Sequence, residues 1–532
     1  MSFEDKVPES WIKGPLKEVP VVLRDDGFTQ FFVVERMTKE VLEKRCIDFL
    51  ADTKVSIKEW GLGPGSVFTF DTKVGETFGS RLTQKQLDML REGDRRVHRS
   101  VKEMIEKGHD PLEVAVNRCH ELGLKIWARL EMNHEYPPPD ENNWLWVGLV
   151  GEFNKKHPEY RLPNSVNLDF SIQAVRDFKL AILREAALKG VDGISMDFAV
   201  YPPFVKNPKE DYPVMTEFVA KVREMTKEIG NKENRKIALI VRVPINYEDI
   251  GLDWKTWVDQ GLIDVIVPTV VRLRDIFDVP IEQFIQYTRG TGCKVFGCIR
   301  PYLGYIDSDS RPEDDKTGVV RYDRDMTDEM FYAKAFLLLR AGVDGIQLAT
   351  GSGDCDPETD NWKKKTDAWK PIYSDAGSPD ILVKKNKDYV FNRKGQLPLV
   401  LSKDQKNTGV VNVRIADDIQ ELMKEKTQLR VVLVLFCRGL EEGEKLNIQV
   451  NDNSPWSLTA EHFKGKDLPI EITKEAVKEQ TYFSKDWWKK GMHEIDVPSD
   501  PWILGNNRIT MSLENGKNDL IVTDMDVKLF FE

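Results

Sequence analysis

The sequence predicts an α/β protein, a (β/α)8 TIM barrel followed by an all-β sandwich domain. Short apolar strands alternate with helical segments over roughly the first 350 residues, and such alternation favours a parallel sheet. Eight strands can be counted in this part of the chain, and eight strand–helix units favour a closed barrel. After about residue 371 helical runs become scarce and alternating strands replace them, as in an antiparallel sandwich.

The barrel strands follow from short apolar runs that end in polar residues. They are expected at positions 20–24, 55–63, 124–130, 191–196, 236–243, 263–268, 293–299 and 343–349. Apolar spacing of the helical kind predicts the helices between them, at 38–52, 83–122, 171–188, 214–229, 254–260, 281–289 and 328–341. An open doubly wound sheet is the rival fold, but the Gly-x-Gly-x-x-Gly turn that it requires does not follow the first strand.

One pentapeptide occurs twice in the barrel region. Gly190-Val-Asp-Gly-Ile and Gly342-Val-Asp-Gly-Ile each follow a helix rich in Ala and Leu, and the glycine in each is expected to end that helix. They precede the fourth and the eighth expected strands. The repeat indicates either two related half-barrels or the same loop chemistry used twice.

The second domain is read from period-two strands. They are expected at 388–391, 410–415, 429–436, 446–450, 493–497, 507–513 and 526–531, separated by turn residues such as Asn515-Gly516. We therefore expect a barrel domain at residues 1–375 and a sandwich domain at 376–532. The boundary is placed in a linker between residues 370 and 385.

Composition narrows the possible partners. The 532 residues carry a formal net charge of −11, which argues against nucleic acid because that needs a basic face. No apolar run approaches the length of a membrane helix, and the first residues lack the apolar core of a signal peptide. The protein is therefore expected either inside the cell or outside it after signal removal, and its localisation and oligomeric state stay open.

Metal, cofactor and disulfide patterns are weak. The six cysteines form no CxxC pair and the seven histidines show no zinc spacing, so we expect reduced thiols, no metal and no cofactor. Asp354, Asp356, Glu358 and Asp360 alternate like calcium-loop ligands. Thr359 stands where such a loop needs glycine, which favours a solvated acidic loop.

Asp197 is the leading candidate for chemistry. It ends the fourth expected strand, and the carboxyl ends of barrel strands form the active-site face; the alternative is that it only caps a turn. Other side chains expected to converge there are Asp26, Glu59, Trp60, Arg129, Glu131, Asn133, His134, Tyr201, Arg242, Arg300 and Tyr302. Carboxylates, an amide, arginines and flat rings are typical of a sugar site, although Arg242 and Arg300 could equally pair with Asp197 or Glu131.

Three tryptophans could stack on a sugar. Trp144 and Trp146 lie on a long loop after the third strand, and Trp60 ends the second strand. Loops of this length in a compact domain are usually functional. The alternative is that these rings plug the top of the barrel.

Several stretches resemble the family-10-like glycoside hydrolases. They are Arg24-Asp-Asp-Gly, the glycine-rich loop 63–79, Glu131-Met-Asn-His, Gly193-Ile-Ser-Met-Asp-Phe and Ala341-Gly-Val-Asp-Gly-Ile. The resemblance covers about residues 15–350 and implies a barrel and a carbohydrate substrate. Asp197 matches the acid on the fourth strand of that family. Glu131 stands where arginine is expected, and Arg300 ends the strand that carries the second glutamate in true family-10 enzymes.

We therefore expect a glycoside hydrolase that cleaves O-glycosidic bonds of an oligo- or polysaccharide. Asp197 and Glu131 are the expected catalytic carboxylates, with Glu59 and Asp26 in reserve. Two alternatives stay open: a non-catalytic carbohydrate-binding barrel, and a lyase acting on an acidic sugar with arginines gripping its carboxylate. The sandwich resembles accessory carbohydrate-binding β-domains in its strand pattern.

Overall fold

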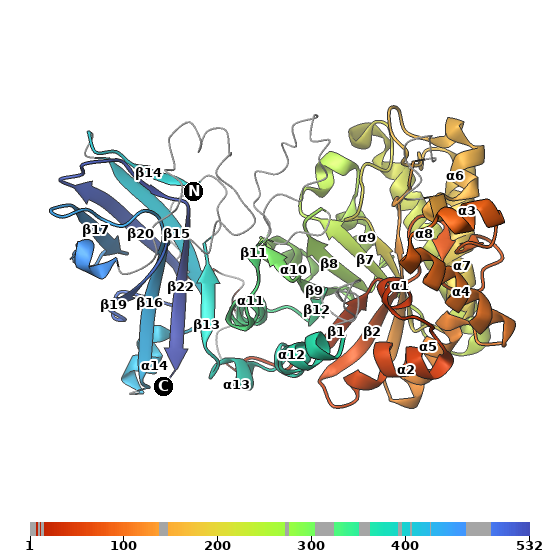
Figure 1. Ribbon diagram of the computed structural model, residues 1–532, viewed down its shortest axis with the longest axis horizontal. Coiled ribbons are helices and arrows are strands. Elements are labelled where there is room, and N and C mark those ends of the chain that lie inside the picture. The colour runs from red at the N-terminus through yellow and green to blue at the C-terminus, as the bar shows by residue number, and fades with distance from the viewer. Residues whose placement is uncertain are drawn as a thin grey trace.

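The computed structural model contains a barrel lobe and a β-sheet lobe side by side (Figure 1). It describes residues 7–8, 11, 15–137, 147–271, 276–303, 324–349, 362–391, 396–404, 407–425, 427–463 and 491–531. Within these residues no helix combines the length and the apolar composition needed to cross a membrane.

Eight parallel strands form a closed barrel, as the sequence predicts. Their order around the barrel is β1-β12-β9-β8-β7-β6-β5-β2. They are β1 (Val21–Asp25), β2 (Val55–Gly61), β5 (Lys125–Glu131), β6 (Gly193–Asp197), β7 (Ala238–Pro244), β8 (Val265–Thr269), β9 (Lys294–Ile299) and β12 (Gly345–Leu348). Two-residue strands decorate the loops, namely β3 (Val67–Phe68), β4 (Glu76–Thr77), β10 (Tyr302–Leu303) and β11 (Arg324–Asp325).

Helices surround the barrel and bury one face against it. They are α1 (Thr29–Val33), α2 (Lys39–Cys46), α3 (Gln84–Met89), α4 (Glu92–Glu106), α5 (Pro111–Glu121), α6 (Glu152–Lys156), α7 (Gln173–Leu188), α8 (Pro208–Glu233), α9 (Trp254–Asp259), α10 (Glu282–Thr288) and α11 (Asp328–Ala341). Gly190 and Gly342 follow α7 and α11 with φ of 93° and 95°, a left-handed conformation that glycine adopts freely at a helix end.

Alternation along the strands divides inward from outward side chains. Inside the barrel, a separate apolar cluster contains Val22, Ile57, Trp127, Ile240, Val265, Val267, Phe296 and Cys298. Two residues further along β1, β2, β5 and β7 come Arg24, Glu59, Arg129 and Arg242. The interior is therefore apolar in its middle and charged toward the carboxyl ends of the strands.

The repeated pentapeptide has a structural role at the opposite end. Asp192 and Asp344 directly precede β6 and β12, and each carboxylate accepts the backbone N–H of the neighbouring strand, from Ile126 at 2.8 Å and from Val295 at 3.0 Å. Asp264 does the same before β8, accepting from Leu239 N at 2.8 Å. The two copies of the repeat thus share the same loop chemistry.

The C-terminal region forms antiparallel sheets, as expected of a sandwich. Their orders are β13-β22-β16-β19, β15-β20-β17-β18 and β14-β21. The strands are β13 (Lys387–Val390), β14 (Leu399–Leu401), β15 (Thr408–Ile415), β16 (Leu429–Phe436), β17 (Lys445–Val450), β18 (Trp456–Leu458), β19 (Met492–Val497), β20 (Gly505–Glu514), β21 (Leu520–Val522) and β22 (Asp524–Phe531), with helix α14 (Ile419–Lys424) between β15 and β16.

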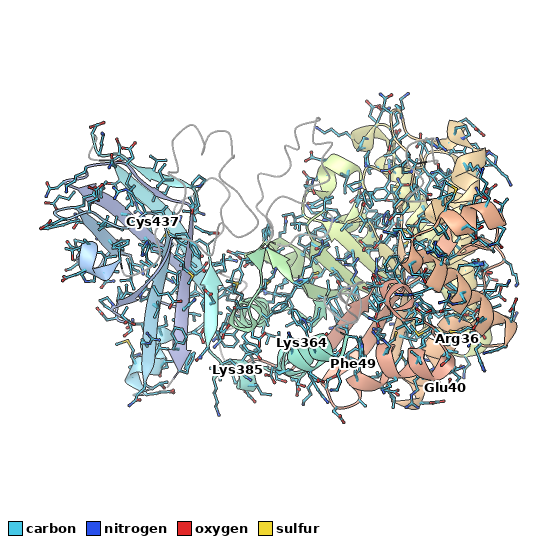
Figure 2. The ribbon with its side chains drawn as sticks, in the orientation of Figure 1. Arg36, Glu40, Phe49, Lys364, Lys385 and Cys437 are labelled. Carbon is cyan, nitrogen blue, oxygen red and sulfur yellow. The ribbon has the colours of Figure 1, made fainter. Side chains whose placement is uncertain are left out.

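The stretch expected to link the domains is folded. Helices α12 (Trp362–Asp375) and α13 (Pro379–Leu382) occupy it, and Tyr373 and Leu382 are buried. Phe49 lies beside α12 (Figure 2), with its ring centroid 6.3 Å from that of Trp362. Polar contacts also join the two domains, because Arg414 of β15 pairs with Asp278 at 3.0 Å. Residues 370–385 are therefore packed rather than extended, while the domain boundary itself stays a prediction.

The described cysteines are free and buried: Cys46, Cys119, Cys293, Cys298 and Cys437. Burial raises the pKa of Cys119 and Cys437 to about 12, so these thiols stay protonated at neutral pH. In the part of the chain that the structure describes, no group of three or more His, Cys, Asp or Glu is placed to hold a metal ion. The acidic run from Asp354 to Asp360 lies outside the described residues.

Candidate active site at the barrel mouth

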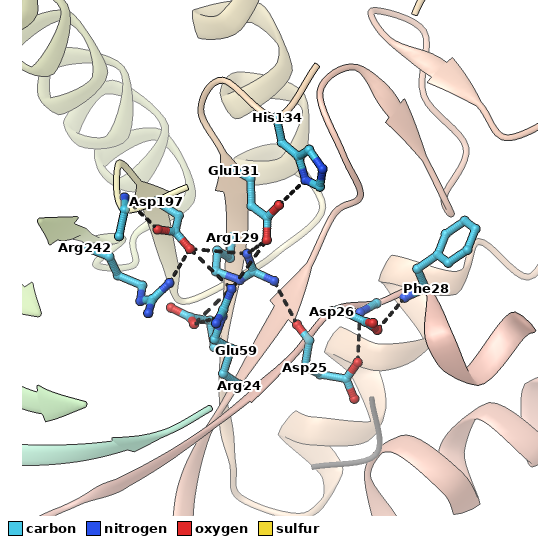
Figure 3. A network of polar contacts seen from close by, with 12 residues as sticks. Arg24, Asp25, Asp26, Phe28, Glu59, Arg129, Glu131, His134, Asp197 and Arg242 are labelled. Atoms are coloured by element: carbon cyan, nitrogen blue, oxygen red, sulfur yellow. Dashed lines mark hydrogen bonds and ion pairs between the residues drawn. The ribbon is translucent and has the colours of Figure 1, made fainter. Parts of the chain in front are cut away.

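A charged cluster fills the carboxyl end of the barrel (Figure 3). We call it the mouth cluster. Its six members come from five strands and are Arg24, Glu59, Arg129, Glu131, Asp197 and Arg242. Parallel strands bring their carboxyl ends to one face, and strand pairing places Glu131 beside Asp197 and Asp197 beside Arg242.

Asp197 is the centre of the mouth cluster. Its side chain is fully buried and its Oδ2 accepts from Arg242 Nη1. The same oxygen lies 3.4 Å from Arg24 Nη2 and 3.4 Å from Arg129 Nη1. Oδ1 accepts the backbone N–H of Ala199 at 3.0 Å. Asp197 therefore both caps the turn after β6 and pairs with arginines, whereas its role in chemistry stays a prediction.

Glu131 shares the same donors. Its Oε1 accepts from Arg129 Nη1 at 2.6 Å and lies 3.4 Å from Arg24 Nη2. Its Oε2 hydrogen-bonds Nδ1 of His134. Since one guanidinium nitrogen contacts both Glu131 and Asp197, the two carboxylates lie side by side rather than on opposite sides of a space that a sugar ring could occupy.

Glu59 lies deepest and is incompletely paired. Its Oε2 accepts from Gln347 Nε2 at 3.0 Å, and Gln347 Oε1 accepts in turn from Arg242 Nε at 3.0 Å. Oε1 of Glu59 is buried and has no hydrogen-bond partner among the described residues, and the same is true of Nε in Arg24 and in Arg129. Buried polar atoms are normally satisfied, so a water molecule or a ligand atom is expected here.

The electrostatics hold both nominated carboxyl groups in the ionised form. Burial raises the pKa of Asp197, but Arg242, Arg24 and Arg129 outweigh it and the pKa lies below its usual value. Burial likewise raises the pKa of Glu131, and Arg129 and His134 bring it well below its usual value. Burial and the neighbouring Arg129 and Arg242 lower the pKa of Arg24 to about 9. Neither carboxyl group is set up to carry a proton at neutral pH.

Aromatic rings form the outer part of the site. His134 packs against Tyr136 and Tyr201, whose ring centroids lie 4.9 and 4.5 Å from its own. Tyr201 is 38% exposed and has φ of 53°, which is uncommon for a residue other than glycine and is typical of functional loops. Flat, partly exposed rings at this position are suited to contact a sugar face.

Strand alternation separates Trp60 from Glu59. Trp60 is 1% exposed and belongs to the core between the barrel and its helices, because adjacent residues of a strand point to opposite sides. This corrects the expectation that both residues face the mouth. Trp144 and Trp146 lie outside the described residues.

Asn133 and Asp26, two further candidates for substrate contact, bind the backbone of loops instead. Asn133 is fully buried and its amide nitrogen donates to the carbonyl oxygens of Leu168 and Pro203 at 3.1 and 3.0 Å. Asp26 is exposed, and its Oδ1 accepts the backbone N–H groups of Phe28 and Thr29, both at 2.9 Å. These contacts fix the loops after β5 and β1, and they occupy the polar atoms that the prediction assigned to substrate.

Arg300 follows β9, is 1% exposed and donates from Nη2 to the carbonyl of Val270 at 3.3 Å. The side chain of Tyr302 lies outside the described part of the chain. Sequence reasoning did not assign Arg24 or Tyr136 to the site. For Arg24 the signal was present, since it lies two residues after the inward-facing Val22.

Comparison with known proteins shows no family. No protein-family model matches the chain, and no curated protein matches it. Among solved structures, a chitinase from Paenibacillus sp. str. FPU-7 has a TM-score of 0.40 and 11% identity, covering 96% of this chain and 54% of its own. A family 27 β-L-arabinopyranosidase from Geobacillus stearothermophilus has a TM-score of 0.38 and 12% identity. The match covers 94% of this chain and 98% of the arabinopyranosidase.

A family 18 N-acetylglucosaminidase from Paenibacillus barengoltzii is similar at a TM-score of 0.35 and 12% identity, covering 66% of this chain and 99% of its own. The chain spans 57% of the length of a cycloisomaltooligosaccharide glucanotransferase from Paenibacillus sp. and 63% of that of an α-galactosidase from Thermus thermophilus, two further structures that it matches. These neighbours are glycoside hydrolases of several families, and the resemblance to family 10 is not confirmed. At such low identity the likeness concerns the barrel fold and assigns no chemistry.

Proposed function

We propose that the protein is a glycoside hydrolase that cleaves an O-glycosidic bond of an oligo- or polysaccharide at the mouth of the barrel. The observation that carries the proposal is Asp197, an ionised carboxylate at the end of the fourth barrel strand that is held by three arginines. Two tyrosine rings pack nearby against His134, the partner of Glu131. Glycosidic cleavage passes through a transition state with positive charge at the anomeric carbon. A fixed carboxylate stabilises that charge.

In this proposal the carboxylates stabilise positive charge and an aromatic ring binds the sugar. Asp197 and Glu131 both carry negative charge and serve as the anionic side of the site. Tyr201 presents a flat, exposed surface for the apolar face of a sugar. Asp197 is fully buried, so in this proposal it acts on the reacting carbon through its charge, and the partly exposed Glu131 acts beside it.

The test is hydrolysis of a broad panel of glycans and aryl glycosides, with binding measured in parallel. Asp197→Asn keeps the shape of the side chain and removes its charge, so turnover should fall roughly 10²-fold or more, a typical effect of losing one catalytic group. Glu131→Gln should also lose activity. Asp344→Asn is the matched control, because it removes a strand-end carboxylate at the opposite end of the barrel. A wild-type chain that hydrolyses nothing in the panel contradicts the proposal.

A non-catalytic carbohydrate-binding barrel is the second candidate. The observation that favours it is the shared Arg129 Nη1 contact of Glu131 and Asp197, because two carboxylates bridged in this way do not flank a bond as an acid and a base do. This candidate predicts saturable glycan binding by calorimetry with no product. Tyr201→Ala should then weaken binding, whereas turnover by the wild-type protein excludes the candidate.

A further inference from the structure

The proposed hydrolase needs a proton donor for the leaving group, and this inference rests on that proposed function. Departure of a sugar alcohol requires protonation of the glycosidic oxygen. Asp197 and Glu131 are both occupied by guanidinium donors that favour their ionised forms. The donor must therefore be another group at the mouth that is within reach of solvent.

We propose that His134 is the general acid and base of the site, exchanging protons with the substrate through Nε2 while Glu131 holds Nδ1. Figure 3 shows His134 at the outer edge of the mouth cluster, directly beyond Glu131. The side chain of His134 is 17% exposed. Part of its surface therefore reaches solvent, as does part of Glu131, whereas Asp197 and Arg242 are fully buried.

The tautomer of His134 follows from its partner. An ionised carboxylate can only accept hydrogen bonds, so the contact between Glu131 Oε2 and Nδ1 requires a proton on Nδ1. The ring nitrogen that is left to gain or lose a proton is Nε2, for which no described residue is a hydrogen-bond partner. A base oriented by a carboxylate through its other nitrogen is a recurring catalytic arrangement.

The His134 ring packs against two tyrosines. Tyr136 and Tyr201 each lie against it at an interplanar angle of 32°, and together with the contact of Nδ1 to Glu131 they restrict rotation of the imidazole. Such restriction is what a proton-transferring group requires, because a small misplacement costs rate. The exposed ring of Tyr201 also places the sugar-contacting surface next to the imidazole.

One histidine is sufficient for both proton transfers of the reaction. The protonated Nε2 gives its proton to the glycosidic oxygen as the bond to the anomeric carbon breaks, and the electron pair of that bond stays on the oxygen. Asp197 stabilises the positive charge at carbon. Water then adds to that carbon and gives one proton to the neutral Nε2, which restores the starting state. The net reaction consumes one water molecule and releases two sugars.

The titratable groups in contact with this imidazole are Glu131, Tyr136 and Tyr201. Further charges act on these neighbours, namely Arg129 and Arg24 on Glu131, and Arg91 and Asp94 on Tyr136. Burial raises the pKa of Tyr136, so its phenol stays protonated. Tyr136→Phe tests whether the Tyr136 hydroxyl is the proton donor instead, and it should keep the pH profile of the wild-type enzyme.

The experiment compares His134→Asn with the wild-type enzyme on nitrophenyl and methyl glycosides of the sugar that the panel identifies. Asparagine keeps an N–H for Glu131 and removes Nε2. Hydrolysis of the methyl glycoside should fall roughly 10²-fold or more, since general acid catalysis contributes that much, whereas the nitrophenyl glycoside, whose leaving group needs no proton, should lose less than roughly 10-fold. The alkaline limb of kcat/KM against pH should disappear.

His157→Asn is the matched control. His157 also hydrogen-bonds a glutamate through Nδ1, at 2.9 Å from Glu159, and stacks on Tyr160, yet it lies outside the mouth cluster. It should leave both rates and the pH profile unchanged. Equal losses on both glycosides in His134→Asn, or a retained alkaline limb, overturn the proposal.

A second measurement does not depend on activity. With 15N-labelled histidine the chain gives seven pairs of imidazole nitrogen signals, and His134→Asn identifies the pair that belongs to His134. The proposal requires the Nδ1–H tautomer at high pH. An Nε2–H tautomer overturns it even if the protein is a hydrolase, and inactivity on every glycoside overturns the proposed function separately.

Discussion

Two buried ionic clusters in this protein are built differently. In the sandwich, the triad of Lys387, Asp417 and Tyr389 is closed: Asp417 Oδ1 accepts from Lys387 Nζ at 3.0 Å and Oδ2 accepts from the Tyr389 hydroxyl at 2.6 Å. At the barrel mouth, Glu59 Oε1 and the Nε atoms of two arginines have no hydrogen-bond partner within the described ranges. A complete cluster serves the fold, whereas an incomplete one has capacity left for a ligand.

The largest effect on stability is expected from Asp417→Asn. The variant leaves the Lys387 ammonium buried without a counter-charge, which costs about 3–5 kcal/mol. Urea denaturation of the variant and the wild-type protein measures the loss. Activity per folded molecule should not change, because the triad belongs to the sandwich.

Asp197→Asn provides the contrast within the mouth cluster. Arg24 and Arg129 keep Glu59 and Glu131 as ion-pair partners, and Arg242 keeps the electrostatic attraction of Glu59. This variant should therefore lose less stability than Asp417→Asn while it loses more activity. The comparison breaks down if the two variants lose stability and activity in the same ratio.

Acid should destabilise the mouth cluster. The folded-state pKa values of Asp197 and Glu131 are lowered, so these groups stabilise the fold above their unfolded values of about 4, and that contribution is lost as pH falls through the lowered values. We expect the free energy of unfolding to drop below about pH 4.

Denaturation at pH 7, 5 and 3 checks this expectation. Glu131→Gln should flatten the acid-dependent part of the curve, because it removes one of the two titrating groups. An unchanged slope in that variant would show that the acid response arises elsewhere in the chain.

The smallest effect is expected from Asp26→Ala. Its exposed carboxylate accepts the backbone N–H groups of Phe28 and Thr29 at the start of α1, and a hydrogen bond of this kind contributes about 0.5–1.5 kcal/mol. Hydrolysis or glycan binding should stay at the wild-type level. A loss of turnover without a loss of melting temperature would return Asp26 to the substrate contacts predicted from the sequence.

The strands were predictable because each barrel strand is a short apolar run that ends in polar residues. All eight expected barrel strands are confirmed, and the ends of β5 and β6 were located closely enough to bring Glu131 and Asp197 together. Pairing of Arg242 with Asp197, one of the two alternatives from the sequence, is what the structure contains.

The side on which a residue faces was harder to predict. A strand end located to within one residue does not distinguish Glu59 from Trp60, although one faces the mouth and the other the core. Asn133 illustrates a second limit, since the carbonyl groups that it binds come from Leu168 and Pro203. Contacts over such sequence distances depend on how loops cross, which no local pattern specifies.

The aspartates before β6, β8 and β12 have a consequence for how this barrel can change. Each ties the start of one strand to its neighbour, at the end of the barrel away from the mouth. Strand register is therefore secured by contacts that the mouth loops do not share. New loops can be grafted onto the carboxyl ends of these strands without moving them, so the scaffold is suited to acquiring other specificities by loop exchange.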